Sequence, residues 1–160
     1  VSFEALAPHR VEAPVQDPPV AGYLRTDEPW AIDLHLEVLV ESAVMREAGI
    51  APHVVSRTGF ADMYWTPAQQ FAHVVAIGAT TRTGDLFASG TGSGPEPGTE
   101  GSFIELARAG ERPIDLPDGT TRTFLDDGAR VILRGWAGGD GTPRIGLGEV
   151  SGTIVPSPGG

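Results

Sequence analysis

The sequence predicts an α+β fold that is predominantly β-structure, with mixed or antiparallel strands in a β-roll-like arrangement and one buried helix at about residues 66–78. Three observations support this fold class. A strand with strict polar and apolar alternation follows a Pro-rich opening. One helix carries a complete N-terminal capping signal. From Gly84 onward, short apolar runs alternate with Gly- and Pro-containing turns.

Residues 1–30 form an expected irregular, extended lead-in, because Pro8, Pro14, Pro18 and Pro19 interrupt any sustained periodicity. The next element is the clearest strand of the chain. Its apolar positions recur at every second residue, at Ile32, Leu34, Leu36, Val38 and Val40. A second, short strand is expected at Val54 and Val55, before Gly59.

The predicted helix begins with Thr66 as its N-cap and Pro67 at its first position. Gln69 completes the Thr-x-x-Gln pattern of a capping box. Residues 71–77 are apolar on nearly every side, which predicts that the helix is buried. Gly78 is the expected terminator.

The remainder of the chain predicts β-structure. Short strands are expected at residues 86–89 and 103–107. Two hairpins follow, one over residues 113–124 with a Pro-Asp-Gly turn and one over residues 130–155 with a Gly-rich turn at 138–141. Residues 156–160 are expected to be a loose tail.

Composition excludes several classes of chemistry. The chain of 160 residues has no Cys, Lys or Asn, so it offers no thiol nucleophile, disulfide or lysine Schiff base. A net charge of −10 argues against a nucleic-acid partner or an anionic membrane surface. Apolar runs fall short of the about 20 residues that span a membrane. With no secretion signal at the start of the sequence, a cytoplasmic location is expected.

A polar row on the alternating strand could bind a divalent metal. Asp33, His35 and Glu37 point to one face, and two carboxylates with an imidazole are a plausible ligand set. The favoured interpretation is an ordinary solvated face, because Glu41 continues the same row. On the predicted helix, His73 is interpreted as a core histidine with a satisfied hydrogen bond rather than a catalytic base.

The segment Gly90–Gly94 has the glycine content of a nucleotide-binding loop. Such a loop needs a helix behind it, and Pro95 and Pro97 argue against one. The segment is either a tight connection or a backbone that lets a ligand approach closely, with nearby hydroxyls on Ser89, Thr91 and Ser93.

Glu105 lies between apolar residues in the strand expected at 103–107. Alternation would place it on the same face as Phe103. Its carboxylate is therefore either solvated or buried with a partner, and the residues alone leave both possibilities open.

Several motifs along the chain resemble those of the fumarylacetoacetase group of the fumarylacetoacetate hydrolase family. The most specific is Ser-Gly-Thr-x-Ser-Gly-Pro-Glu-Pro at residues 89–97, which separates fumarylacetoacetases from the related hydrolases, hydratases and decarboxylases. The others are Asp27-Glu-Pro29, Met63-Tyr-Trp-Thr66, Gln69-Gln70, Gly84-Asp-Leu86, Pro113-Ile-Asp-Leu116, Thr121-Arg-Thr-Phe-Leu125 and Gly139-Asp-Gly141 with Arg144–Gly148.

The resemblance implies a hydrolase that cleaves the C–C bond of a β-diketo acid, fumarylacetoacetate, to fumarate and acetoacetate in tyrosine and phenylalanine degradation. It also implies a homodimer and a divalent cation, magnesium or calcium. By position, Thr91 matches a threonine that contacts the substrate, and Glu105 matches the glutamate that orients a catalytic histidine. The histidine is the general base toward water.

The family's metal ligands, catalytic histidine and substrate-binding Tyr, Arg and Gln would precede Val1. Residues 31–155 are therefore expected to be the C-terminal part of the catalytic domain, inactive alone and completed by an N-terminal remainder. Two alternatives stay open: a related hydrolase acting on an acylpyruvate or another β-dicarbonyl compound, and a non-catalytic binding module of the same fold.

Overall fold

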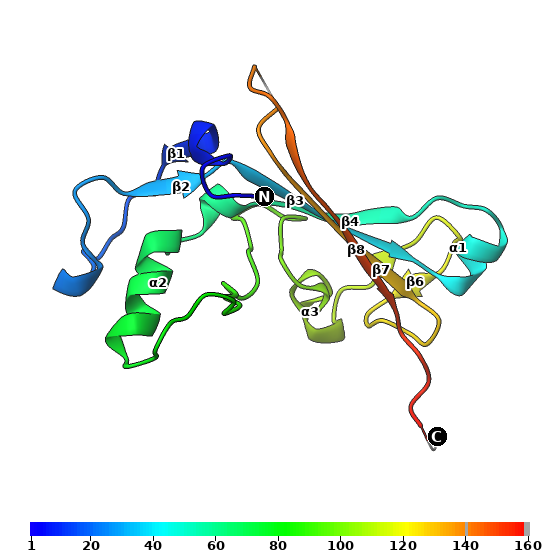
Figure 1. Ribbon diagram of the computed structural model, residues 1–160. Coiled ribbons are helices and arrows are strands. Elements are labelled where there is room, and N and C mark those ends of the chain that lie inside the picture. The colour runs from blue at the N-terminus through cyan, green and yellow to red at the C-terminus, as the bar shows by residue number, and fades with distance from the viewer. Residues whose placement is uncertain (140, 159–160) are drawn as a thin grey trace.

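A four-stranded antiparallel sheet runs through the centre of the computed structural model, which describes residues 1–139 and 141–158 (Figure 1). The strand order is β4-β3-β7-β8, with β3 at Leu34–Glu41, β4 at His53–Gly59, β7 at Arg130–Ala137 and β8 at Ile145–Thr153. All of these neighbours pair antiparallel. The predominantly β class is thereby confirmed.

Two small antiparallel sheets and a few short helices complete the fold. β1 (Arg10–Glu12) pairs with β2 (Trp30–Ile32), and β5 (Ile114–Asp115) pairs with β6 (Thr121–Arg122). The α-helices are α1 (Ala43–Glu47), α2 (Pro67–Ala76) and α3 (Phe103–Leu106). Single 3₁₀ turns lie at Ala7–His9, Gly22–Leu24, Phe60–Asp62 and Arg108–Gly110. No helix among the described residues has the length and apolarity to cross a membrane.

Both predicted hairpins form. The first is the pair β5 and β6, and the second is β7 and β8, in which Arg130 faces Thr153 and Ala137 faces Ile145. The predicted turn at 138–141 contains Asp140, which lies outside the described residues, as do residues 159–160 of the predicted tail. Residues 10–12, expected within the irregular lead-in, instead form β1.

Residues 103–107 were expected to be a strand, and this prediction is wrong. They form α3, which begins after Ser102 because the serine hydroxyl accepts a hydrogen bond from the Glu105 N–H. A second wrong prediction concerns residues 86–89, which form no strand. Leu86 is 97% exposed, and the Phe87 ring lies 5.5 Å from that of Phe71 in α2, so this run contacts a helix rather than a partner strand.

The capping box of α2 is confirmed, with Thr66 and Gln69 exchanging both hydrogen bonds. Burial on all sides is not: Phe71 is 48% exposed, Val75 45% and Ile77 69%. α2 lies at the end of the molecule near β1 and β2 (Figure 1), and the described residues cover only the side that carries Gln69.

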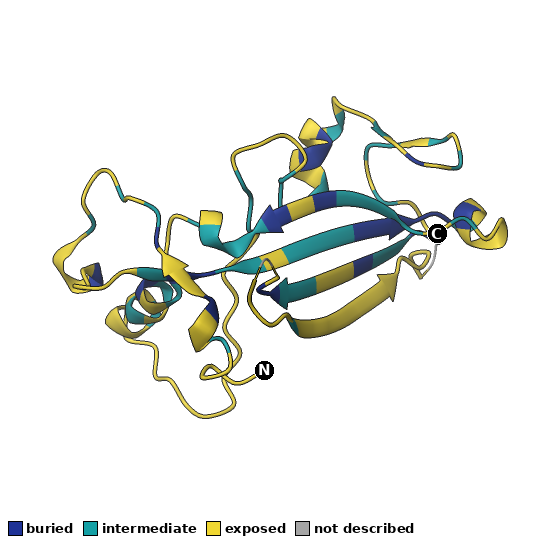
Figure 2. Cartoon of the chain, turned by 90° about the horizontal axis from the view of Figure 1, so that it is seen from above, coloured by how far each residue is buried: buried dark blue, intermediate teal, exposed yellow. Residues whose placement is uncertain are grey.

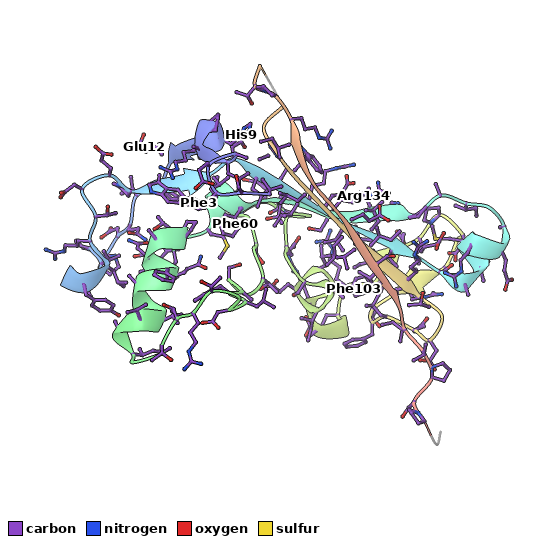
Figure 3. The ribbon with its side chains drawn as sticks, in the orientation of Figure 1. Phe3, His9, Glu12, Phe60, Phe103 and Arg134 are labelled. Atoms are coloured by element: carbon purple, nitrogen blue, oxygen red, sulfur yellow. The ribbon has the colours of Figure 1, made fainter. Side chains whose placement is uncertain are left out.

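Buried apolar side chains lie on both faces of the central sheet, with Leu39 and Ile132 on one face and Val40 on the other. Val38, Val40, Val131 and Leu133 of β3 and β7 line one pocket together with Phe103 and Leu106 of α3. Phe103 and Arg134 are labelled on opposite sides of these strands in Figure 3. The outermost strand, β8, is exposed along nearly its whole length (Figure 2).

Candidate functional site

Glu105 is held through only one of its two carboxylate oxygens. The hydroxyls of Ser93 and Ser102 each donate a hydrogen bond to Oε2, both at 2.9 Å. Within residues 1–139 and 141–158, no hydrogen-bond donor or cation meets Oε1. The side chain is exposed, so the carboxylate presents one unoccupied oxygen on the surface of the described chain.

The loop that carries Thr91 and Ser93 lies against the start of α3 through a glycine contact. A Cβ on Gly101 would be 2.3 Å from the carbonyl oxygen of Gly92, a distance that no other residue type could tolerate. The Gly101 N–H also donates to the Ser93 hydroxyl at 2.9 Å. These two contacts bring Ser93 within reach of Glu105, twelve residues further along the chain.

Two further hydrogen bonds attach this loop to the sheet. The Arg57 N–H donates to the Gly98 carbonyl at 3.2 Å, and the Ser56 hydroxyl donates to the Glu100 carbonyl at 2.7 Å. Both donors lie on β4. Because β4 is an edge of the sheet, the bond from the Arg57 N–H occupies a backbone group that has no partner strand on that side. The rigid sheet therefore supports the loop that holds Glu105.

Thr91 is exposed on this loop, two residues before Ser93. The structure thus places both residues predicted for the site, Thr91 and Glu105, on one connected piece of backbone. Their roles toward a substrate remain predictions. Sequence reasoning gave no role to Ser93 and Ser102 as partners of Glu105, although Ser102-x-x-Glu105 has the spacing of a helix capping pattern.

Glu37 and Glu41, the two glutamates of the polar row that lie on β3, are not on a solvated face as predicted. Glu37 contacts Arg57 at 2.9 Å and Arg134 at 4.0 Å, and its side chain is 12% exposed. Glu41 contacts Arg46 at 3.3 Å and Arg130 at 3.8 Å, and its side chain is 9% exposed. Arginines of β4, α1 and β7 therefore neutralise two largely buried carboxylates.

A third carboxylate, Asp118, uses both of its oxygens. The Ser42 hydroxyl donates to Oδ2 at 2.5 Å, while the hydroxyl and N–H of Thr120 donate to Oδ1 at 2.6 and 2.9 Å. These bonds stabilise the ionised form and, with the charge of Arg122, lower the pKa of Asp118 from 3.8 to about 2. Asp118 connects the β5–β6 hairpin to the N-cap of α1.

The described residues contain no group of three His, Asp or Glu side chains that could hold a metal ion. The metal site considered for Asp33, His35 and Glu37 does not form, because the three side chains do not converge. His35 of β3 lies 3.2 Å from Asp33, the residue between β2 and β3, whereas Glu37 contacts its two arginines. The residues present therefore do not fit a divalent cation by themselves.

The prediction of a core histidine on the helix is wrong, and the buried histidine is a different one. His73 is exposed and forms a hydrogen bond with the Tyr23 hydroxyl at 3.0 Å, so it is not a core residue. His9 is the buried histidine, 4% exposed, beside Gly138. Among the described residues, neither imidazole forms a hydrogen bond or an ion pair with Glu105.

Residues 19–155 match the family model described as fumarylacetoacetate (FAA) hydrolase C-terminal. The chain belongs to the fumarylacetoacetate hydrolase family. The match includes the central sheet, α2, the glycine-rich loop and α3. Both Thr91 and Glu105 therefore lie within the part of the chain that the family shares.

Curated relatives have the same coverage. The chain is 44% identical over 157 residues to the fumarylacetoacetase of Homo sapiens, 43% over 158 residues to that of Caenorhabditis elegans and 41% over 158 residues to that of Arabidopsis thaliana. These alignments cover 98–99% of this chain and 36% of each relative. The chain thus spans about a third of the length of the fumarylacetoacetases that it matches.

Proposed function

We propose that the complete protein containing this chain is a fumarylacetoacetase, which hydrolyses a C–C bond of fumarylacetoacetate to give fumarate and acetoacetate. The observation that carries this proposal is the carboxylate of Glu105 in α3, beside the loop with the specific family motif. Two hydroxyls hold its Oε2, and no donor among the described residues meets its Oε1. The family and the named relatives support the choice of reaction.

In this proposal Oε1 of Glu105 accepts a hydrogen bond from the N–H of a histidine supplied by sequence before Val1. That bond fixes the tautomer in which the other ring nitrogen is unprotonated and able to take a proton from water. The negative charge of the carboxylate also stabilises the imidazolium that forms. Glu105 is thus an electrostatic and orienting group, and the histidine is the base.

The bonds balance with one water molecule. Water oxygen bonds to the ketone carbon of the fumaryl group, which becomes a carboxyl carbon of fumarate, and a water proton passes to the histidine. The C–C bond then breaks, and its electron pair remains on the acetoacetate carbon, which takes the proton back from the imidazolium. Thr91 is proposed to donate a hydrogen bond from its hydroxyl to a substrate oxygen, which contributes to binding.

A divalent cation, magnesium or calcium, would supply positive charge near the developing carbanion. Because the described residues do not form a ligand cluster, we assign its ligands to sequence outside this chain and attribute no step to residues 1–160 through the metal. We also propose a homodimer, a cytoplasmic location and a role in tyrosine and phenylalanine degradation, on the basis of the family resemblance alone.

The proposal is tested by incubating the complete protein with fumarylacetoacetate and quantifying fumarate and acetoacetate by chromatography. Equal amounts of the two products are expected, together with their near-complete loss in Glu105→Gln. Cleavage of a shorter acylpyruvate but not of fumarylacetoacetate would replace this substrate with a related β-dicarbonyl compound.

The length of the native protein provides an independent test. Denaturing mass spectrometry of protein purified from its source should show a species well above the 16.7 kDa of this chain. A single species near that mass, with no companion chain, would instead favour a non-catalytic binding module. Light scattering on the same sample should give twice the mass of one protomer if the enzyme is a homodimer.

A further inference from the structure

We propose that Ser93 and Ser102 are positioning residues that together hold Oε2 of Glu105, so that only Oε1 is presented to the catalytic imidazole. This inference rests on the proposed function above. It assigns a task to two side chains that do not touch the reacting atoms. The two hydroxyls approach from different parts of the chain, one from the glycine-rich loop and one from the residue preceding α3.

Two donors on one oxygen restrict the carboxylate more than one donor does. A glutamate has three rotatable side-chain torsions, so an exposed carboxylate with a single partner can rotate and exchange its oxygens. Hydrogen bonds at 2.9 Å from Ser93 and Ser102 fix both the position and the plane of the group. Both hydroxyls are neutral, so they orient the carboxylate without cancelling the charge that the imidazolium needs.

The backbone around the two serines is built to keep them in place. Ser93 also accepts the Gly101 N–H at 2.9 Å, which leaves its hydroxyl proton directed to Glu105. Ser102 accepts the Glu105 N–H at 3.3 Å while it donates to the Glu105 carboxylate. Each serine hydroxyl thus accepts one backbone N–H and donates to the Glu105 carboxylate. The close contact between Gly92 and Gly101 sets the distance between the two backbone segments that carry the serines.

Helix capping alone would be the simpler role for Ser102, and the chain contains a matched control for it. Ser42 is the N-cap of α1, accepts the Met45 N–H at 2.9 Å and donates to the carboxylate of Asp118. It therefore has the same two interactions as Ser102, at a carboxylate outside the proposed site. Capping by itself predicts similar consequences for both serines.

The experiment measures kcat, KM and the thermal unfolding midpoint of the complete enzyme for Ser93→Ala, Ser102→Gly and Ser42→Gly. Glycine is chosen because it retains most of the stability of an N-cap while removing the hydroxyl. A hydrogen bond to a charged group corresponds to about a tenfold effect or more, so Ser93→Ala and Ser102→Gly should each lower kcat about tenfold. KM should change by less than about twofold, because neither serine is proposed to bind substrate.

Two further variants sharpen the result. Ser102→Thr keeps both the cap and the hydroxyl, so its kcat should stay close to that of the parent. The double variant Ser93→Ala/Ser102→Gly should lower kcat about 10²-fold and approach the level of Glu105→Gln. Ser42→Gly should leave kcat unchanged while lowering the unfolding midpoint as much as Ser102→Gly does.

Kcat values within about twofold of the parent in both Ser93→Ala and Ser102→Gly, alongside an inactive Glu105→Gln, would overturn the positioning role and leave the proposed function intact. A fall in kcat for Ser42→Gly equal to that for Ser102→Gly would also overturn it, because the effect would then come from capping. Full activity in Glu105→Gln would overturn the proposed role of the glutamate and the positioning role together.

Discussion

Glu105 and the acidic row of β3 show two ways in which one fold treats a carboxylate. Glu37 and Glu41 are largely buried, and each lies between two arginines. Glu105 is exposed and held by two neutral hydroxyls at one oxygen. The arginines bring positive charge to both oxygens of Glu37 and to Oε2 of Glu41, which suits a structural role. Hydroxyls at one oxygen retain the charge and leave an acceptor, which suits a role toward an imidazole.

Asp118 shows that a carboxylate held by hydroxyls can still have both of its oxygens occupied. Like Glu105 it is held by hydroxyls, from Ser42 and Thr120, yet both of its oxygens are used. It connects two short elements, and each of its oxygens accepts at least one hydrogen bond. Hydroxyl ligands alone therefore do not mark a functional carboxylate, and the role proposed for Glu105 depends on its place beside the loop that carries the family motif.

The largest effect is expected from Glu105→Ala in the complete enzyme. Loss of the group that orients and charges the base should lower kcat by about 10²-fold or more. The unfolding midpoint should change little, because the carboxylate is exposed. Steady-state kinetics and thermal unfolding on the same preparation check both statements. If Glu105→Ala kept the parental kcat, Glu105 would have a structural role, like Glu37, and no role in catalysis.

Gly101→Ala should be the next largest. Its Cβ would lie 2.3 Å from the Gly92 carbonyl oxygen, so the backbone segments around Gly92 and Gly101 must move apart. We expect a loss of about 1–3 kcal/mol in unfolding free energy, measured by urea denaturation, and a fall in kcat as Ser93 moves from Glu105. Gly146→Ala is the control, since a Cβ there meets nothing within 4 Å. Equal stability of the two variants would contradict the tight contact.

Glu37→Gln should have the opposite profile to Glu105→Ala. Its arginine partners are 70% and 44% exposed, so solvent screens the pairs and the loss should be about 1 kcal/mol. Kcat should remain at the parental value. Urea denaturation and kinetics test this contrast, and a large loss of activity with unchanged stability would show that the two kinds of carboxylate had been assigned the wrong way round.

Thr91→Val should mainly raise KM. Removal of one neutral hydrogen bond to substrate corresponds to about a fivefold change, with kcat nearly constant. Thr121→Val, an exposed threonine on β6, is the control and should change neither constant. An unaltered KM in Thr91→Val would remove Thr91 from the proposed substrate contacts and leave Glu105 of α3 as the one proposed site residue.

The smallest effect is expected at Asp118 and depends on pH. Because folding lowers the pKa of Asp118 from 3.8 to about 2, the ionised form favours the folded state. This contribution is fully present above pH 3.8 and disappears as the pH falls toward about 2. Asp118→Asn should remove the corresponding part of the pH dependence, measured as unfolding midpoints over this range. Parallel curves for parent and variant would contradict the hydroxyl contacts.

The elements that sequence predicted correctly are those with local signals. The capping box of α2 involves residues only three apart, and each hairpin has its turn between two neighbouring strands. The wrong predictions are short apolar runs, at residues 86–89 and 103–107, for which strand and helix give the same pattern. At α3, the Ser102 cap decides between them.

The sequence by itself determined the β-rich class and the family motif. It also identified Thr91 within that motif and Glu105 after it as the candidate site residues. Tertiary structure alone decided which carboxylates are neutralised, because strand register brings Arg134 of β7 beside Glu37 of β3. The fold also decided that Ser93 meets Glu105, through a glycine contact between two parts of the loop. Cross-strand pairing and loop closure join residues distant in the chain, and no local pattern of side chains specifies such partners.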